Sequence, residues 1–344
     1  MTMNTTLQFC EQDGTVSCQL CAHCCRIRLG SRGRCGVREN RDGSLHSLVY
    51  GRLVAENADP VEKKPLHHFL PSSRTWSIAT VGCNFTCAHC QNHQISQYPR
   101  LNQGRIIGSQ RSPEETIAAA QQQGCQSISY TYVEPTIFYE FARDCMVLAH
   151  ERGLANIFVS NGYMTEECAR ALAPHLDAIN IDIKAFSEDF YRRICGARLK
   201  PVLDTVRLLH GLGVWVEVTT LLIPGLNDSP AELEQIARFI HALSPDLPWH
   251  LSAFHPAYTM LDRQPTPAAS LLAARQIALA NGLHFVYLGN VRSPEGEDTV
   301  CPACGAVLIR RSGFFMQRNR LLAGTCPDCG SAIAGVWHSS AQSA

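Results

Sequence analysis

The chain has 344 residues, a formal net charge of zero, and hydrophobic and charged fractions of 45% and 17%. These values predict an ordinary globular protein with a large buried core, and they argue against a nucleic-acid or anionic-membrane surface. No apolar run approaches a membrane span and no signal segment is seen, so we expect a cytoplasmic protein. Its 17 cysteines are then better read as metal ligands than as disulfides, because cytosolic thiols are kept reduced.

Strand-like and helix-like segments alternate between about residue 75 and residue 290. A helix should begin at Ser112 with a capping box to Glu115, and a second should span residues 135–152. Strands are expected over residues 75–81, 126–131, 156–159, 178–183, 214–221, 250–254 and 283–287. This alternation predicts an α/β fold with a parallel sheet, built as a partial barrel with its chemistry at the carboxyl ends of the strands. The competing doubly wound sheet lacks support, since no G-x-G-x-x-G follows the first strand.

A short loop after the first strand carries Cys83, Cys87 and Cys90 in the spacing C-x3-C-x2-C. Thiolates select iron–sulfur clusters, zinc or cuprous copper. A four-iron cluster takes four ligands, so three cysteines would leave one iron open. At this point a zinc knuckle completed by a distant fourth ligand is the alternative.

Polar residues recur where the later strands end: Glu134, Asn161, Asp182, Lys184 and His255. Each has a structural alternative. Glu134 suits a helix start, Asn161 suits a turn, and Asp182 with Lys184 suits a solvated ion pair. Their joint occurrence after a three-cysteine loop favours one functional site over the zinc knuckle.

Two further cysteine groups flank this region. Near the carboxyl end, two C-P-x-C-G knuckles supply Cys301, Cys304, Cys326 and Cys329. This spacing predicts a structural zinc ribbon, with a rubredoxin-like iron site as the alternative.

Near the amino end, Cys18, Cys21, Cys25 and Cys35 also offer four ligands, with Cys24 as a spare and His23 as a substitute. Zinc and an auxiliary iron–sulfur cluster fit these ligands equally well.

The segments 82–92, 130–136, 160–163 and 182–186 resemble the AmmeMemoRadiSam-system radical S-adenosylmethionine (SAM) proteins, relatives of the pyruvate formate-lyase activating enzymes. Segments 62–69 and 301–305 fit as well, so the resemblance covers nearly the whole chain. Two residues depart from the pattern: His89 replaces the usual aromatic residue, and Val133 replaces an expected asparagine.

The resemblance implies a radical SAM partial (β/α)6 TIM-like barrel over residues 71–292. A cysteine-rich extension (residues 1–70) would precede it and a zinc ribbon (residues 298–340) would follow. Cys83, Cys87 and Cys90 would hold a [4Fe–4S] cluster, and SAM would lie among the following residues: Glu134, Asn161, Asp182, Lys184 and His255.

In such enzymes the reduced cluster cleaves SAM to a 5′-deoxyadenosyl radical, which abstracts hydrogen from a substrate. An electron donor of the flavodoxin or ferredoxin type is implied. The substrate is an unidentified small molecule or protein, and Memo-like and AMMECR-like proteins are the partners that the resemblance suggests. A glycyl-radical-enzyme activase is the alternative enzyme. A non-catalytic binding module with zinc at all three sites is the alternative of another class.

Overall fold

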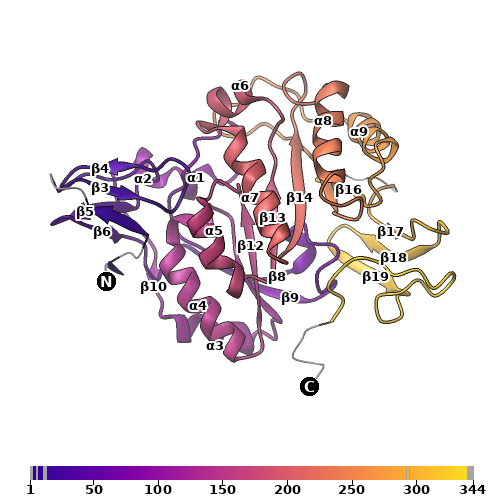
Figure 1. Cartoon of the computed structure of the whole chain (residues 1–344), viewed down its shortest axis with the longest axis horizontal. Helices are drawn as coiled ribbons and strands as arrows, with labels where there is room; N and C mark the ends of the chain where they lie inside the picture. The colour runs from indigo at the N-terminus through magenta and orange to yellow at the C-terminus, as the bar shows by residue number, and fades with distance from the viewer. Residues whose placement is uncertain (1–2, 5–6, 11–13, 292, 294, 339–344) are drawn as a thin grey trace.

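The computed structural model describes residues 3–4, 7–10, 14–291, 293 and 295–338. Its centre is an eight-stranded sheet in the order β16-β15-β14-β13-β12-β11-β9-β8 (Figure 1). The strands are β8 (Ala55–Pro60), β9 (Arg74–Ala79), β11 (Ser127–Tyr130), β12 (Ala155–Ser160), β13 (Ala178–Asp182), β14 (Trp215–Leu222), β15 (Trp249–Ala253) and β16 (Val286–Gly289). All neighbours from β9 to β16 pair in parallel, whereas β8 pairs antiparallel to β9. The predicted α/β partial barrel is confirmed.

The helices follow the strands and cover the outside of the sheet; α4, α5 and α7 lie in front of it in Figure 1. The longer helices are α3 (Pro113–Gln122), α4 (Tyr139–Glu151), α5 (Glu166–Leu172), α7 (Leu199–Gly211), α8 (Pro230–His241) and α9 (Ala268–Ala280). The short ones are η1 (Val61–Lys63), α1 (His93–Ser96), α2 (Tyr98–Leu101), η2 (Pro135–Phe138), η3 (Ala173–His175), α6 (Glu188–Phe190) and η4 (Tyr191–Cys195). No helix among the described residues combines the length and the apolarity needed to cross a membrane.

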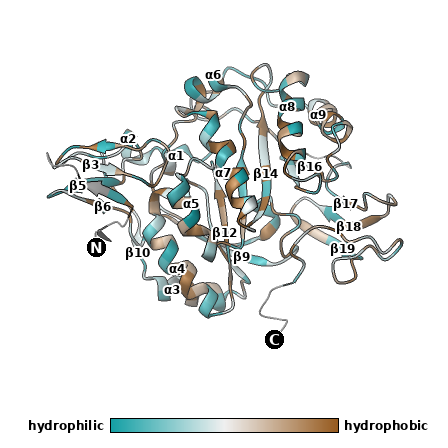
Figure 2. Ribbon diagram, viewed as in Figure 1, coloured by the Kyte–Doolittle hydropathy of each residue, from teal (hydrophilic) through white to brown (hydrophobic). Residues whose placement is uncertain are grey.

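The capping box predicted at Ser112 starts α3, whereas the helix predicted over residues 135–152 is divided into η2 and α4. Ser112 and Glu115 form a reciprocal capping box, with each side chain accepting from the other residue's amide. Figure 2 shows apolar residues concentrated on the central strands and polar ones on the outer helix surfaces. One large apolar core therefore forms between the sheet and its helices, and the carboxyl ends of the parallel strands meet at one edge.

The amino-terminal residues form small antiparallel sheets at one end of the molecule, and the last residues form another at the opposite end (Figure 1). The first part contains β1 (Met3–Asn4), β2 (Gln8–Cys10), β3 (Val16–Cys18), β4 (Arg26–Ile27), β5 (Arg38–Arg41), β6 (Ser44–Ser47) and β7 (Arg52–Leu53), the last pairing with β10 (Ser109–Gln110). The second part, residues 298–338, is called the ribbon here and contains β17 (Thr299–Val300), β18 (Val307–Ser312) and β19 (Phe315–Asn319).

The ribbon is attached to the barrel by a buried chain of hydrogen bonds. His68 Nδ1 donates to the Ala334 carbonyl at 2.7 Å, and the Tyr287 hydroxyl donates to His68 Nε2 at 2.6 Å. Tyr287 Oη also bonds Thr299 Oγ1 at 2.7 Å, and the Leu288 amide of edge strand β16 donates to the Gly296 carbonyl at 2.9 Å. A small apolar cluster surrounds these contacts. The ribbon is thus fixed to the barrel by buried polar and apolar contacts together.

Candidate functional site

The three-cysteine loop, residues 82–90, leaves the carboxyl end of β9. Gly82 has φ +98°, and a Cβ there would lie 2.6 Å from Val37 and 2.9 Å from the Cys35 carbonyl. Only glycine fits this position, because the backbone is left-handed and the neighbours are too close for a side chain. The loop is further fixed by backbone bonds from Thr86 to Cys195 at 2.9 Å and from Ala88 to Ile194 at 3.0 Å.

The surroundings of the three thiols suit a bound metal cluster. Burial raises the pKa of the Cys83 and Cys90 thiols, and a hydrogen bond with Cys195 together with burial raises the pKa of Cys87. Binding a metal would deprotonate these thiols and release their protons. Two buried nitrogens of the loop, Asn84 Nδ2 and His89 Nδ1, have no hydrogen-bond partner among the described residues. Buried polar atoms normally have partners, so these residues fit a missing polar or anionic group.

Two of the predicted strand-end residues meet the loop in one network. Asn161, after β12, donates through Nδ2 to Asn84 Oδ1 at 2.7 Å. The buried Glu134 carboxylate accepts from the Asn161 amide at 2.7 Å, from the Ser160 hydroxyl at 2.9 Å and from the Thr136 amide at 3.1 Å. Burial nevertheless raises the pKa of Glu134. Because internal donors already occupy both oxygens, the structure shows Glu134 holding Asn161 and starting η2.

Asp182, the last residue of β13, and Lys184, two residues later, form an ion pair with an N–O distance of 2.9 Å. Burial alone would lower the pKa of Lys184, but Asp182 and the nearby thiols of Cys87 and Cys195 raise it well above its usual value. Lys184 is therefore a fixed positive charge beside the three-cysteine loop. The Lys184 side chain is 15% exposed and the Asp182 side chain is 34% exposed, so the pair lies partly in solvent.

His255 lies apart from this network. Its side chain is exposed, and Nε2 donates to the Asn290 carbonyl at 3.3 Å. The loop that carries it does reach the site, because the Thr259 amide donates to the Ala88 carbonyl at 3.1 Å. No described contact joins the His255 side chain itself to the three-cysteine loop.

Sequence reasoning missed two residues of the site. Cys195, which belongs to none of the three predicted cysteine groups, lies at the end of η4 with its thiol against Cys87. Asn227 donates to the Lys184 carbonyl at 2.6 Å and so fixes the backbone that carries the lysine. Neither is close in sequence to its partner. For Asn227, the only available signal was its position after the fifth predicted strand.

The four ribbon cysteines form a closed group. The ligand atoms of Cys301, Cys304, Cys326 and Cys329 all lie within 4.8 Å of one another, and this is the only such group of three or more Cys, His, Asp or Glu residues in the described part of the chain. Cys301 and Cys329 have their sulfurs 3.7 Å apart, as do Cys304 and Cys326. A tetrahedron with metal–sulfur bonds of about 2.3 Å has edges of about 3.8 Å. The ribbon is therefore shaped for one tetrahedral metal ion.

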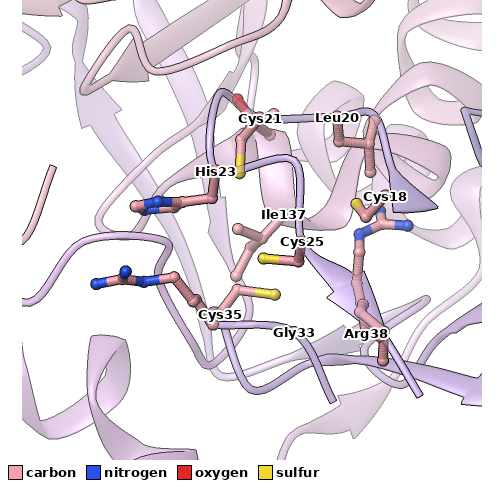
Figure 3. Close-up of a pocket in the computed structure, with 12 residues that line it drawn as sticks. Cys18, Leu20, Cys21, His23, Cys25, Gly33, Cys35, Arg38 and Ile137 are labelled. Atoms are coloured by element: carbon pink, nitrogen blue, oxygen red, sulfur yellow. The ribbon is translucent and has the colours of Figure 1, made fainter. Parts of the chain in front are cut away.

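The amino-terminal cysteines line a pocket (Figure 3). Cys18, Cys21, Cys25 and Cys35 all face it, whereas Cys24 is exposed and does not line it. His23 lines the pocket, but its Nε2 donates to the Asn84 carbonyl at 2.8 Å. The predicted four-cysteine set is thus brought together, and it adjoins the three-cysteine loop.

Comparisons with known proteins agree with this geometry. The sequence profile of the Radical SAM superfamily matches residues 77–240. An uncharacterised protein of Methanocaldococcus jannaschii, MJ0808, is 45% identical over 324 residues, covering 93% of this chain and 96% of its own. The pyruvate formate-lyase-activating enzyme of Clostridium pasteurianum is 22% identical over 165 residues, covering 46% of this chain and 66% of its own.

Among solved structures, SuiB of Streptococcus suis bound to its precursor peptide matches with a TM-score of 0.50 at 11% identity. The match covers 67% of this chain and 51% of that chain, so it supports the fold alone.

The chain belongs to the radical SAM superfamily and is a radical SAM enzyme with distant similarity to glycyl-radical activating enzymes. Membership implies a [4Fe–4S] cluster and SAM. Membership of an enzyme superfamily excludes the alternative hypothesis of a non-catalytic binding module with zinc at all three sites.

Proposed function

We propose that Cys83, Cys87 and Cys90 hold the [4Fe–4S] cluster, with SAM on its open iron. The observation that carries this assignment is the Asn161–Asn84 hydrogen bond of 2.7 Å, which joins the end of β12 to the three-cysteine loop. Reductive cleavage of SAM at the cluster supplies the 5′-deoxyadenosyl radical. Cys83, Cys87, Cys90, Asn161, Asp182, Lys184, Glu134 and His255 are the site residues of the proposal.

The proposed roles follow from the contacts of each residue. Lys184 gives a fixed positive charge beside Cys87 and orients Asp182 toward the SAM site. Glu134 positions Asn161 through the Asn161 amide. His255, which is exposed, lies on the loop that contacts Ala88 and is the residue nearest to bulk solvent in this set.

We propose an unidentified small molecule as the substrate, within an AmmeMemoRadiSam-type system that includes Memo-like and AMMECR-like partners. The resemblance of segments 82–92 and 130–136 to that system supports this choice. An electron donor of the flavodoxin or ferredoxin type would reduce the cluster. Activation of a glycyl residue on a partner enzyme is the second candidate, favoured by the 22% identity to a pyruvate formate-lyase-activating enzyme.

We further propose that the ribbon cysteines bind zinc and that the chain divides into the three parts 1–70, 71–292 and 298–340. The sulfur–sulfur distances of 3.7 Å support the zinc assignment. Zinc sites of this kind contribute directly to folding, and a segment as small as the ribbon has little core without one.

Anaerobic reconstitution tests the radical chemistry. The reduced protein with SAM should form 5′-deoxyadenosine, and a Cys83→Ala, Cys87→Ala, Cys90→Ala triple variant should form none. The Cys24→Ala variant is the matched control, because Cys24 is exposed and lies outside every proposed ligand set. Equal product formation by the triple variant would refute the cluster assignment.

Deuterium transfer separates the two substrate classes. Reactions are run with a fully deuterated cell extract divided into small-molecule and protein fractions. Deuterium in 5′-deoxyadenosine from the small-molecule fraction supports the preferred substrate, whereas deuterium from the protein fraction alone supports the activase.

A further inference from the structure

Four thiols from the amino-terminal part surround one small pocket, whose cavity volume is about 20 Å³. Cys18 ends β3, Cys21 and Cys25 lie on the turn that follows, and Cys35 lies in the next loop. Figure 3 shows their sulfur atoms turned toward a common space. Apolar side chains complete the wall, Leu20, Ile27 and Ile137 among them. A group bound here would be enclosed by sulfur and hydrocarbon.

The spacing of these sulfurs differs from that in the ribbon. The ribbon sulfurs pack within 4.8 Å of one another, as four ligands of one ion must. Across the described residues, the amino-terminal four form no group that meets the same limit. In a [4Fe–4S] cluster each thiolate bonds a different iron, so the four sulfurs stand farther apart than around a single ion. The wider spacing of the sulfurs fits a cluster better than it fits one zinc ion.

A buried donor points to an anionic occupant of this pocket. Arg38 lines the pocket and is only 2% exposed. Its two terminal nitrogens each donate one hydrogen bond to the Glu140 carboxylate, at 2.9 and 2.5 Å, and Nε takes no part in this pair. Arg38 Nε is buried, and in the part of the chain that the structure describes it has no hydrogen-bond partner. A thiolate-ligated cluster is anionic and offers sulfur acceptors, so it would satisfy this nitrogen.

The pocket adjoins the proposed SAM cluster. His23 in its wall bonds the Asn84 carbonyl at 2.8 Å, and the Cys35 carbonyl lies 2.9 Å from the place where a Cβ of Gly82 would be. Cys35 and Cys83 are therefore carried by backbone segments in direct contact.

We propose that Cys18, Cys21, Cys25 and Cys35 hold a second [4Fe–4S] cluster, fully ligated by thiolates, beside the SAM cluster. Its four protein ligands leave no iron open, so SAM does not bind to it. The position of this second cluster beside a SAM cluster rests on the proposed function. The presence of the second cluster is tested separately.

The first test removes the SAM cluster. The Cys83→Ala, Cys87→Ala, Cys90→Ala variant, reconstituted anaerobically with iron and sulfide, should keep about half of the wild-type iron and acid-labile sulfide. Adding Cys35→Ala to the triple variant should remove that remainder, while adding Cys24→Ala should leave it. Loss of all sulfide from the triple variant, with a second zinc ion bound in its place, would overturn the proposal.

A second test uses the unmodified enzyme and so does not depend on how the variants fold. After reduction, electron paramagnetic resonance should resolve two cluster signals, of which SAM shifts one and leaves the other unchanged. A single signal that SAM shifts completely would overturn the second cluster. If the proposed function alone were wrong, no 5′-deoxyadenosine would form, yet the sulfide of the triple variant would remain.

Discussion

Asn161 Nδ2 donates a hydrogen bond of 2.7 Å to Asn84 Oδ1, so the end of β12 directly supports the three-cysteine loop. Removing this donor leaves Asn84 Oδ1 with only a weak 3.8 Å contact from the Cys83 thiol, which is lost once that thiol binds a metal. A buried acceptor without a partner costs about 1–3 kcal/mol. We expect Asn161→Ala to lose iron to a chelator faster than the parent enzyme. Asn281→Ala, which removes a side-chain donor at the end of α9, is the control and should not change the rate. Equal rates for all three proteins would contradict a supporting role of Asn161.

Lys184 is the fixed positive charge beside Cys87. Replacing it by methionine removes this charge and leaves Asp182 unpaired, so the rate of 5′-deoxyadenosine formation should fall by about 10- to 100-fold, as is usual for residues that support metal ligands. The rate is measured at saturating SAM with equal iron content. Lys200→Met breaks an exposed lysine–aspartate pair and should leave the rate unchanged. A full rate for Lys184→Met would exclude Lys184 from the site.

The ribbon should depend on its metal. Cys326→Ser breaks the tetrahedral set, so about one zinc ion per chain should be lost and residues 298–338 should become sensitive to protease. Zinc content and limited proteolysis measure both effects. Cys125→Ala changes a buried cysteine outside every set and should affect neither. A protease-resistant ribbon without zinc would show that the apolar cluster alone holds it.

His68 should make the protein sensitive to acid. Burial lowers its pKa to about 4, although Glu217 partly opposes this effect. In the unfolded chain His68 has an ordinary histidine pKa of about 6.5, so between about pH 6.5 and pH 4 it is protonated there but remains neutral in the folded protein. The free energy of unfolding therefore falls as the pH drops from about 6.5 to about 4. The lowered pKa of His68 corresponds to a loss of about 3 kcal/mol in the free energy of unfolding across this pH interval.

Replacing His68 by glutamine removes that titration. The unfolding free energy of His68→Gln should therefore vary less with pH over this interval, as measured by urea denaturation. His67, whose pKa burial also lowers, keeps its own contribution in both proteins. Parallel pH profiles for the parent and the variant would assign the acid sensitivity to other residues.

The sequence predicted the parallel strands because each is a short run of apolar and β-branched residues, but it did not predict β8. The segment Ala55–Pro60 contains Glu56, Asn57 and Asp59 and has no alternation that would mark a strand. The segment is recognised as a strand only by its hydrogen bonds to β9, and these bonds exist only in the folded protein.

In the candidate site, too, some features could be predicted from the sequence and others could not. The three-cysteine loop and the ribbon knuckles were predictable because their ligands lie close in sequence. The contact of Cys87 with Cys195 and the pair of Arg38 with Glu140 join residues about a hundred positions apart. Periodicity and spacing describe neighbours along the chain, so they carry no information on such contacts.

The hydrogen bond from Leu288 to Gly296 has a consequence for the behaviour of the protein in concentrated solution. A partial barrel does not close, and β16 is its last parallel strand. An uncovered edge of this kind offers backbone groups to the sheet of another molecule and promotes aggregation. The segment that leads into the ribbon bonds the Leu288 amide, so this backbone group of the β16 edge is not free to pair with the sheet of another molecule.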